Sequence, residues 1–424
     1  MDRIKLFPPE QKKLTSVNIS LEYSKSESNR LLVIRQFCKQ IFEIKNLSES
    51  DDTKVMLDVL ERDSMRIQRD EKAVYNVGHA GTAMRFLCAY FSITPGTYVL
   101  TGSDRMKERP IGNLVNALRF LGSEIEYLEE EGYPTLLIKG KKIPGGSVTV
   151  DSGMSSQFIS ALMLIAPTLE EGLKLSLIGK TVSSSYIVMT ASLMHEFGID
   201  AKITGNDIFI PSGGYRLNNN SLYPVESDWS AASYFYAFAA LSKGSVLFLK
   251  GLKNISHQPD SICAELFKQF GVESEFINDG VKIFSNSKFI PEFFSYDFTN
   301  CPDLVQTIAI VCSGLNISAR FTGVSTLRIK ETDRVIALKN ELKKINVELE
   351  ISDSNTFNIY PHKSDFVRSD IVIQTYNDHR MAMCFAPLCL IHSGITIENP
   401  SVVSKSFPNF WNEIQKTGIR LNIV

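Results

Sequence analysis

A succession of one helix and two short strands recurs along this chain, and it constrains the possible folds more than any other feature of the sequence. In each copy an amphipathic helix ends at a small residue, often Gly, and two short alternating strands follow. The clear copies read LVNALRFLGSEIEYLEEEGYPTLLIKG, LMHEFGIDAKITGNDIFIPSG, LFKQFGVESEFINDGVKIFSN and LKNELKKINVELEISDSNTFNIYP. A looser copy begins near Leu57, and a truncated one begins at Ile414 and would be completed by a strand from the N-terminus.

The copies are roughly 60 to 75 residues apart, and a unit of this size cannot bury its own apolar face, so sister units must pack against one another. Six units would fill the 424 residues, a length that favours two domains over one. We therefore predict an α/β protein with three units in each of two domains. The alternative is that helix, turn and hairpin, which are common neighbours in proteins, follow one another here by chance.

Composition and charge narrow the class of protein. Apolar residues make up 44% of the chain and charged residues 22%, as in folded globular proteins. The formal net charge is -2, which gives no reason to expect a nucleic acid or a membrane as partner. The cysteines lie in apolar stretches such as FLCAYF without a CxxC pair, and no apolar run resembles a signal peptide or a membrane span. We therefore expect reduced thiols and a cytoplasmic location.

Several expected helices begin with cations, although the amino end of a helix already carries partial positive charge. Capping by Ser, Asp, Asn and Gly explains most polar residues in these first turns. It does not explain positive charges, which the helix dipole disfavours by about 0.3 kcal/mol or more. A phosphate or carboxylate bound there would explain them. The cations concerned are Lys25, Arg30, Arg85, Lys330, Arg334 and Arg380.

The segment RMKERPIG carries cations at every second residue. An extended backbone would send Arg105, Lys107 and Arg109 to one side, where they would converge on an anion. A solvated edge strand is the alternative.

Two further segments combine cations with acidic or capping residues. In LRIKETDRV, a helix would stack Lys330 and Arg334 on one face beside Glu331, or the run is simply a solvated helical face. Asn377 and Asp378 are expected to cap a helix with His379 and Arg380 in its first turn, a start that suits an anion. The histidines show no metal-ligand spacing, so no metal site is expected.

Taken together and in order, the motifs resemble the enolpyruvyl transferase family, and within it the branch that acts on shikimate 3-phosphate. The resemblance covers nearly the whole chain. The motifs that carry it are SKSESNR, AGTAMR, RMKERPIG, SSQF, SSSY, AASYF, KETDR, TYNDHRMAMCF and KSFPNF.

The resemblance implies a two-domain inside-out α/β barrel with three βαβαββ units per domain. Domain one would comprise residues 1–22 and 242–424, domain two would be residues 23–241, inserted, and the active site would lie in the cleft between them. The implied reaction transfers the enolpyruvyl group of phosphoenolpyruvate to the 5-hydroxyl of shikimate 3-phosphate, on the route to chorismate and aromatic amino acids. No metal or organic cofactor and a monomeric, cytoplasmic enzyme are implied.

The resemblance also assigns residues. The shikimate 3-phosphate site would comprise Lys25, Ser26, Arg30, Ser155, Ser156, Gln157, Ser183, Asp303 and Lys330. The phosphoenolpyruvate site would comprise Lys25, Gly81, Arg109, Gln157, Arg334, Arg380 and Lys405. Asp303 would be the base, Lys330 and Glu331 would handle the second proton, and supporting roles would fall to Arg85, Tyr186 and His379.

Two alternatives stay open beside this interpretation. The sister enzymes that use UDP-N-acetylglucosamine normally have an Asn after the first lysine and a cysteine in the loop of RMKERP, whereas this chain has Ser26 and no cysteine in that loop. A non-catalytic anion-binding protein on the same fold would lack the proton-transfer residues that are present here. Three residues depart from the family pattern. Tyr23 stands where Gly is usual, His79 where Asn or Asp is usual, and Phe86 where Pro is frequent.

Overall fold

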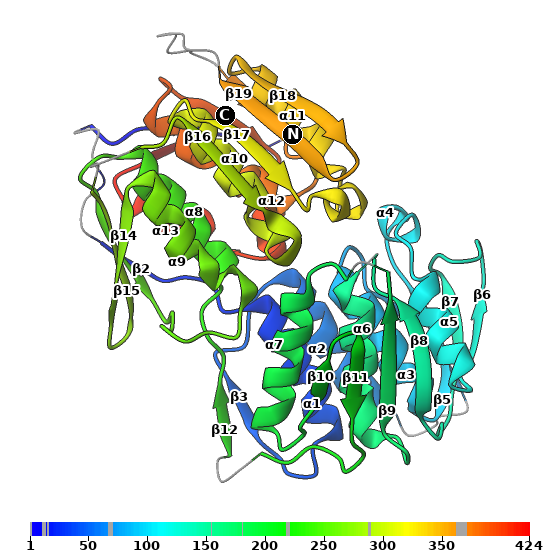
Figure 1. Ribbon diagram of the computed structural model, residues 1–424. Helices are drawn as coiled ribbons and strands as arrows, with labels where there is room; N and C mark the ends of the chain where they lie inside the picture. The colour runs from blue at the N-terminus through cyan, green and yellow to red at the C-terminus, as the bar shows by residue number, and fades with distance from the viewer. Residues whose placement is uncertain are drawn as a thin grey trace. The chain divides into compact units, whose positions relative to one another are not determined.

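The chain forms two compact units in a computed structural model that describes residues 2–10, 14, 17–66, 71–153, 155–179, 181–217, 221–286, 290–361 and 371–424. The first unit combines Met1–Tyr23 with Glu226–Val424, and the second unit is the continuous segment Ser24–Val225 (Figure 1).

The second crossover between the units differs from the expected position near Leu241. It falls at Val225 and Glu226, so the helix α8 (Trp229–Leu241) belongs to the first unit. The buried carboxylate of Glu226 fixes this start, because it accepts hydrogen bonds from Trp229 Nε1 at 2.9 Å and Lys253 N at 2.9 Å. The sequence pattern did not indicate this boundary, since α8 is apolar on all sides and would fit the core of either unit.

The second unit contains two complete βαβαββ repeats. In each, the first two strands are parallel and the final hairpin adds two antiparallel strands, giving the sheet orders β4-β5-β7-β6 and β8-β9-β11-β10. The elements are β4 (Lys72–Asn76), α3 (Gly81–Ile93), β5 (Gly96–Thr101), α5 (Gly112–Phe120), β6 (Glu124–Tyr127), β7 (Leu136–Gly140), β8 (Gly146–Asp151), α6 (Ser156–Ile165), β9 (Leu173–Ile178), α7 (Ser184–Glu196), β10 (Lys202–Thr204) and β11 (Asp207–Ile210).

The third repeat of this unit is shorter than expected. The helices α1 (Lys25–Phe37) and α2 (Asp51–Ser64) accompany β3 (Glu43–Lys45), which pairs in parallel with β12 (Leu222–Pro224). The looser copy predicted near Leu57 is therefore wrong in part: α2 forms, but the next described strand, β4, pairs with β5 of the following sheet. Residues 67–70 lie outside the described part of the chain.

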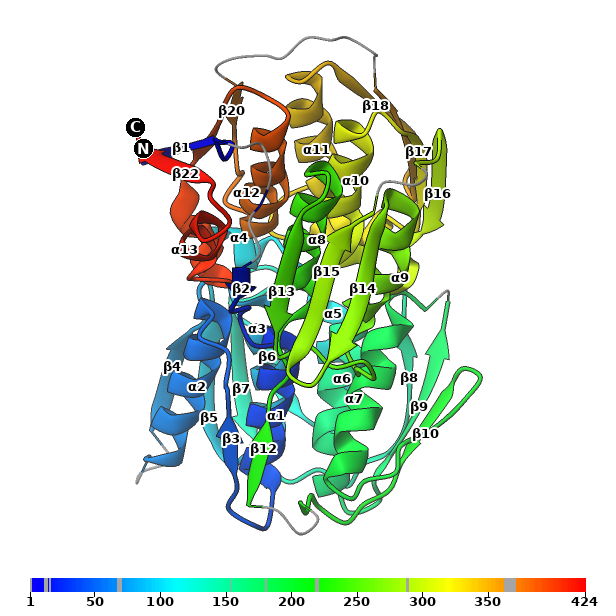
Figure 2. The same ribbon diagram turned by 90° about the vertical axis from the view of Figure 1, so that its left-hand side faces the viewer.

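The first unit contains three repeats with the same strand order. Its sheets are β2-β13-β15-β14, which faces the viewer in Figure 2, then β16-β17-β19-β18 and β20-β21-β1-β22. The elements are β2 (Val17–Ile19), α8, β13 (Val246–Lys250), α9 (Cys263–Leu266), β14 (Val272–Ile277), β15 (Gly280–Ser285), β16 (Phe293–Asp297), α10 (Val305–Gly314), β17 (Ser318–Thr322), α11 (Arg334–Lys343), β18 (Val347–Asp353), β19 (Thr356–Pro361), β20 (Ile371–Ile373), α12 (His379–Phe385), β21 (Ile395–Glu398), α13 (Phe410–Gln415), β22 (Arg420–Ile423) and β1 (Arg3–Phe7).

The N-terminal strand completes the last repeat, as predicted for the truncated copy at Ile414. Strand β1 lies between β21 and β22 and is antiparallel to both, with Ile4 opposite Ile397 on one side and Ile423 on the other. The prediction is confirmed, and it explains how a chain that ends in a single strand still closes a four-stranded sheet.

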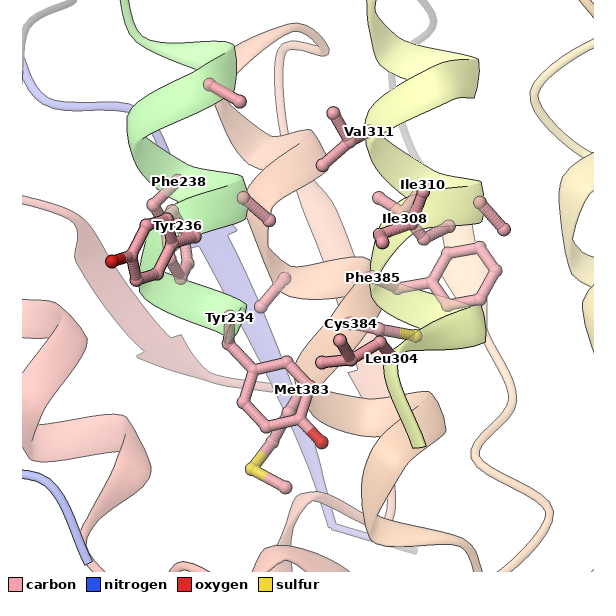
Figure 3. Close-up of a cluster of buried hydrophobic side chains, with 14 of the residues drawn as sticks. Tyr234, Tyr236, Phe238, Leu304, Ile308, Ile310, Val311, Met383, Cys384 and Phe385 are labelled. Atoms are coloured by element: carbon pink, nitrogen blue, oxygen red, sulfur yellow. The ribbon is translucent and has the colours of Figure 1, made fainter. Parts of the chain in front are cut away.

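Helices rather than sheets fill the interior of each unit. In the first unit α8, α10 and α12 are buried along most of their length, and Figure 3 shows that all three helices contribute to one cluster of buried side chains, among them Phe238, Ile308 and Phe385. The strands bury alternate residues, as in β17, so their other face is left for solvent. This is the inside-out α/β arrangement that was predicted. Within the described ranges, no helix combines the length and apolarity needed to span a membrane.

Candidate active-site residues in each unit

Arg334 is the centre of an ion-pair cluster in the first unit. It is the first residue of α11 and is only 2% exposed. Its Nε lies 2.7 Å from Asp378 Oδ2, Nη1 lies 3.1 Å from Asp303 Oδ1, and Nη2 lies 2.8 Å from Glu331 Oε2. These carboxylates offset the burial of the guanidinium and raise the pKa of Arg334 above its ordinary value.

Two more cations join the same carboxylates. Arg380 Nη2 lies 2.7 Å from Asp303 Oδ2, and Lys405 Nζ lies 2.9 Å from Glu331 Oε1. Asp303 and Glu331 therefore each bridge two cations. We call the six residues the arginine–carboxylate cluster; they are Asp303, Glu331, Arg334, Asp378, Arg380 and Lys405.

The charge balance in the cluster decides the protonation of Asp303. Burial alone would raise the pKa of its carboxyl group, but Arg380, Lys330 and Arg334 together more than offset burial and hold the pKa below its ordinary value. Asp303 is consequently a carboxylate at neutral pH, able to accept a proton.

Helix starts and short 3₁₀ turns supply these side chains. Asp303 lies in η5 (Pro302–Leu304), just before α10, and Lys405 ends η8 (Pro400–Lys405). Asp378 caps α12 through its side chain, which accepts a hydrogen bond from Arg380 N at 2.9 Å, so the predicted cap is confirmed. The cap places His379, 1% exposed, in the first turn.

Lys330 does not share a helix with Arg334, which corrects the prediction that the two cations stack on one helical face. Lys330 follows the 3₁₀ helix η6 (Ser325–Ile329) with an extended backbone, and α11 starts only at Arg334. Asp333 causes the late start, because its side chain caps the helix by accepting hydrogen bonds from Val335 N and Ile336 N.

In the second unit, Lys25 and Arg30 extend from α1 into different surroundings. Lys25 begins the helix and its Nζ lies 3.2 Å from Asp52 Oδ2 of α2. Arg30 is 2% exposed; its Nε donates to Thr190 Oγ1 at 2.7 Å, and Nη2 donates to Ser160 Oγ at 3.2 Å. Burial lowers the pKa of Arg30 to about 10. The Arg30 hydrogen bonds join α1 to α6 and α7, and its Nη1 also donates to Ser26 O at 2.8 Å.

Arg109 is buried against the first turn of α3. The ideal Cβ of an alanine at Gly81 would lie 2.7 Å from Arg109 Nη1, so only glycine leaves room for the guanidinium. Arg109 is 7% exposed, and across the described residues it has no carboxylate partner and its Nε makes no hydrogen bond. A buried guanidinium without a counter-ion is costly, which makes this position a candidate anion site.

The segment before Arg109 is helical, so the expected extended backbone was wrong. Ser103 caps α4 (Asp104–Lys107), accepting a hydrogen bond from Met106 N. The helical turn sends Arg105 to Glu108 at 2.7 Å and Lys107 to Glu129 at 2.6 Å, both at the surface. Arg109 alone of the three cations is buried.

The remaining candidates lie at helix starts of the second unit. Ser155 caps α6, which begins with Ser156, and Gln157 Nε2 donates to Thr82 Oγ1 at 3.1 Å, joining α6 to α3. Ser183 precedes α7 with a left-handed backbone (φ 53°).

The supporting residues and the departures from the family pattern also have defined contacts. Arg85 donates to Gly81 O and Pro110 O, both at 3.1 Å, and thereby holds the backbone beside Arg109. The ring of Tyr186 lies 6.0 Å from the Arg30 guanidinium and that of Phe86 lies 5.5 Å from it. The backbone of Tyr23 forms an isolated antiparallel β-bridge with Ser227 in the first unit, and His79 Nδ1 is 2.9 Å from Ser103 Oγ.

Sequence reasoning missed several residues in these surroundings. Asp52, Ser230 and Tyr234 contact candidate residues although they lie far from them in the sequence, and Asp260 is hydrogen-bonded to Ser230. No local pattern marks them, because only the tertiary fold brings them close. No three His, Cys, Asp or Glu side chains lie together as potential metal ligands in the part of the chain that the structure covers.

Both units are built from βαβαββ repeats, and both place buried cations at or near helix starts, an arrangement that suits the binding of small anions. A sequence profile described as EPSP synthase (3-phosphoshikimate 1-carboxyvinyltransferase) matches residues 10–414. The chain belongs to this family, whose members are transferases.

Individual relatives agree with the profile. The chain is 43% identical to the 3-phosphoshikimate 1-carboxyvinyltransferase of Bacteroides fragilis strain YCH46, with 99% of both chains covered. It is 36% identical to that of Sulfurovum sp. strain NBC37-1, with 94% of this chain and 95% of the relative covered. A solved structure of EPSP synthase from Acinetobacter baumannii has the same fold, with a TM-score of 0.77, 22% identity and full coverage of both chains.

Proposed function

We propose that the chain transfers the enolpyruvyl group of phosphoenolpyruvate to the 5-hydroxyl of shikimate 3-phosphate, releasing phosphate, in the pathway to chorismate and aromatic amino acids. The observation that carries the proposal is Asp303, a carboxylate held between Arg334 and Arg380. A proton acceptor fixed among cations suits a reaction whose substrates are all anions.

The proton-transfer steps follow from the reacting groups. Protonation of the methylene carbon of phosphoenolpyruvate by Glu331 or Lys330 makes the adjacent carbon electrophilic. Asp303 takes the proton of the 5-hydroxyl as its oxygen forms a bond to that carbon. In the second half the C–O bond to phosphate breaks and phosphate leaves, while the new methyl group returns a proton to Glu331 or Lys330, which restores the double bond.

The cations of the cluster would bind the substrate anions and would also set the pKa of the base, Asp303. When a substrate carboxylate or phosphate binds to Arg334, Arg380 and Lys405, its negative charge weakens the electrostatic attraction of these cations for Asp303. The pKa of Asp303 then rises from its lowered value towards the ordinary one, which makes the residue a better base during turnover. Binding and proton transfer are coupled through the same side chains.

The second unit would contribute binding to the same reaction. Arg109 supports this role because it is buried beside the amino end of α3 without a counter-ion among the described residues. Lys25, Gln157 and Ser183 would complete the set that holds the phosphorylated sugar acid and phosphoenolpyruvate. Because Lys and Arg neutralise the charge, we expect no metal requirement.

A cytoplasmic, monomeric enzyme remains part of the proposal. All seven cysteines are free thiols and six of them are buried, which supports a reducing environment.

A phosphate-release assay with phosphoenolpyruvate and shikimate 3-phosphate in EDTA tests the proposal. We expect turnover that needs both substrates and is unaffected by the chelator. Release with UDP-N-acetylglucosamine instead would favour the sister activity. Binding of both anions without any release would favour a non-catalytic anion-binding protein.

A further inference from the structure

Asp260 is a buried carboxyl group that none of the proposed steps uses. It lies in η2 (Pro259–Ile262) and is 2% exposed. Its Oδ2 accepts a hydrogen bond from the hydroxyl of Ser230 in α8. Its Oδ1 is buried and finds no hydrogen-bond partner among the residues that the structure describes. A buried oxygen left in this way is costly for an ionised carboxylate and much less so for a neutral acid.

Asp260 is connected to the arginine–carboxylate cluster through Ser230. The Ser230 hydroxyl oxygen lies 3.4 Å from Arg380 Nη2, the nitrogen that also lies 2.7 Å from Asp303 Oδ2. Asp260 and Asp303 therefore share one guanidinium, the first through a hydroxyl and the second directly. Tyr234, which lies beside Met383 in Figure 3, accepts from Arg380 Nη1 at 3.2 Å and fixes the other side of the group.

The groups around Asp260 disfavour its ionisation. Burial, and then the negative charge of Asp303, raise the pKa of Asp260 to about 7, with a smaller contribution from Asp228. Arg380 and the Ser230 hydrogen bond act in the opposite direction without offsetting burial. Cys263 and Cys301 also interact with Asp260, and burial raises the pKa values of both, so they stay neutral thiols.

We propose that Asp260 is a positioning residue for Arg380 that takes up a proton from solvent when an acidic substrate binds to this guanidinium. The inference rests on the proposed function only for the identity of that substrate, phosphoenolpyruvate. In the step, one carboxylate and one proton become a carboxylic acid, and no other bond changes. The neutral acid no longer attracts Arg380, which is then available to the substrate.

Asp260 is better suited to this role than Asp303. An incoming anion adds negative charge beside the carboxylates of Asp260 and Asp303. Protonation of one carboxylate reduces the repulsion, and it costs least at the group with the higher pKa, which is Asp260. Arg380, Lys330 and Arg334 hold the pKa of Asp303 far lower, so Asp303 keeps its charge and its role as acceptor.

The dependence of KM for phosphoenolpyruvate on pH tests the inference. In the wild-type enzyme we expect KM to rise above about pH 7, approaching ten-fold per pH unit, because binding then requires uptake of a proton. The value of kcat should show no matching break. Asp260→Asn carries no titratable proton, so its KM should stay near the low-pH wild-type value up to about pH 9. Glu265→Gln, which removes an exposed carboxylate of the neighbouring α9 paired with Lys268, should keep the wild-type profile.

Two results would overturn the inference. A break in KM that persists in Asp260→Asn would mean that another group, such as the buried His379, titrates instead. A KM that is raised by the same factor at every pH would mean that Asp260 only supports the fold.

A binding measurement keeps the inference testable without turnover. Inorganic sulfate does not titrate near neutral pH, so protons taken up when it binds must enter the protein. Calorimetry of sulfate binding in two buffers of different ionisation enthalpy should show uptake of about half a proton or more at pH 7.5 in the wild type. Asp260→Asn should bind sulfate without this proton uptake. Absence of uptake in the wild type would overturn the inference, whereas failure of phosphate release alone would refute only the proposed function.

Discussion

Asp303 receives ion pairs from two arginines, and this double pairing determines what its removal should do. Asp303→Ala takes away the proposed base and leaves Arg334 and Arg380 with more positive charge for an incoming anion. We therefore expect kcat to fall by about 10²–10⁴-fold while both substrates still bind. Single-turnover kinetics and equilibrium binding of shikimate 3-phosphate measure the two effects separately.

Asp58→Ala is a suitable control for this variant, because Asp58 is an exposed carboxylate in a surface pair with Arg62. Asp58→Ala should change neither kcat nor the binding of shikimate 3-phosphate. Loss of binding in Asp303→Ala with nearly normal kcat would show that Asp303 organises the arginines and is not the base.

At the scale of residues, the sequence predicted the cations better than their partners. Arg334 and Arg380 were recognisable as cations in or near the first turn of a helix, where positive charge conflicts with the helix dipole. The convergence of Asp303, Glu331 and Asp378 on one guanidinium was not predictable, because these residues come from separate repeats or turns. Only packing of α10, α11 and α12 in one core brings them together.

At the scale of elements, the position of the Arg109 guanidinium beside the first turn of α3 depends on having no side chain at Gly81. Gly81→Ala should leave stability nearly unchanged, because alanine is the better helix former by about 1 kcal/mol. Its Cβ would nevertheless lie 2.7 Å from Nη1 and 2.9 Å from Nη2 of Arg109, so the guanidinium must move. We expect KM for phosphoenolpyruvate to rise about ten-fold, which corresponds to a loss of about 1.4 kcal/mol.

Gly112 offers a matched control for this substitution. It is also the first residue of its helix, α5, and the Cβ of an alanine there would meet its nearest neighbour at an ordinary 3.4 Å. Gly112→Ala should leave KM unchanged. Equal effects of the two alanines would indicate that the contact with Arg109 has no part in binding.

Element boundaries failed in the sequence reasoning where capping residues overrode a charge pattern. The alternation of Arg105, Lys107 and Arg109 favoured an extended segment, but Ser103 and Asp104 start a helical turn that separates the three side chains. Hairpins were predicted more reliably, because alternation in strands such as β18 and β19 reflects burial on one face of a sheet.

At the scale of the whole molecule, the two units differ in how the chain assembles them. The second unit is one continuous segment, whereas the first unit needs β1 and β2 from the N-terminus. Pairing of β1 with β22 joins the two ends of the chain, and contacts of such sequence separation form slowly. The repeat count was predictable from periodicity. The crossover at Glu226 was not, because it depends on hydrogen bonds to residues that follow α8.

Residues 24–225 expressed alone should fold, because the second unit has its own buried helices and closes its sheets without the N-terminus. We expect one cooperative thermal transition by circular dichroism and calorimetry. Residues 226–424 alone should not fold, since removal of β1 leaves β21 and β22 without the strand that joins them. A cooperative transition in the second fragment would show that the first unit folds without β1 and β2, and no transition in the first fragment would show that the second unit depends on the rest of the chain for stability.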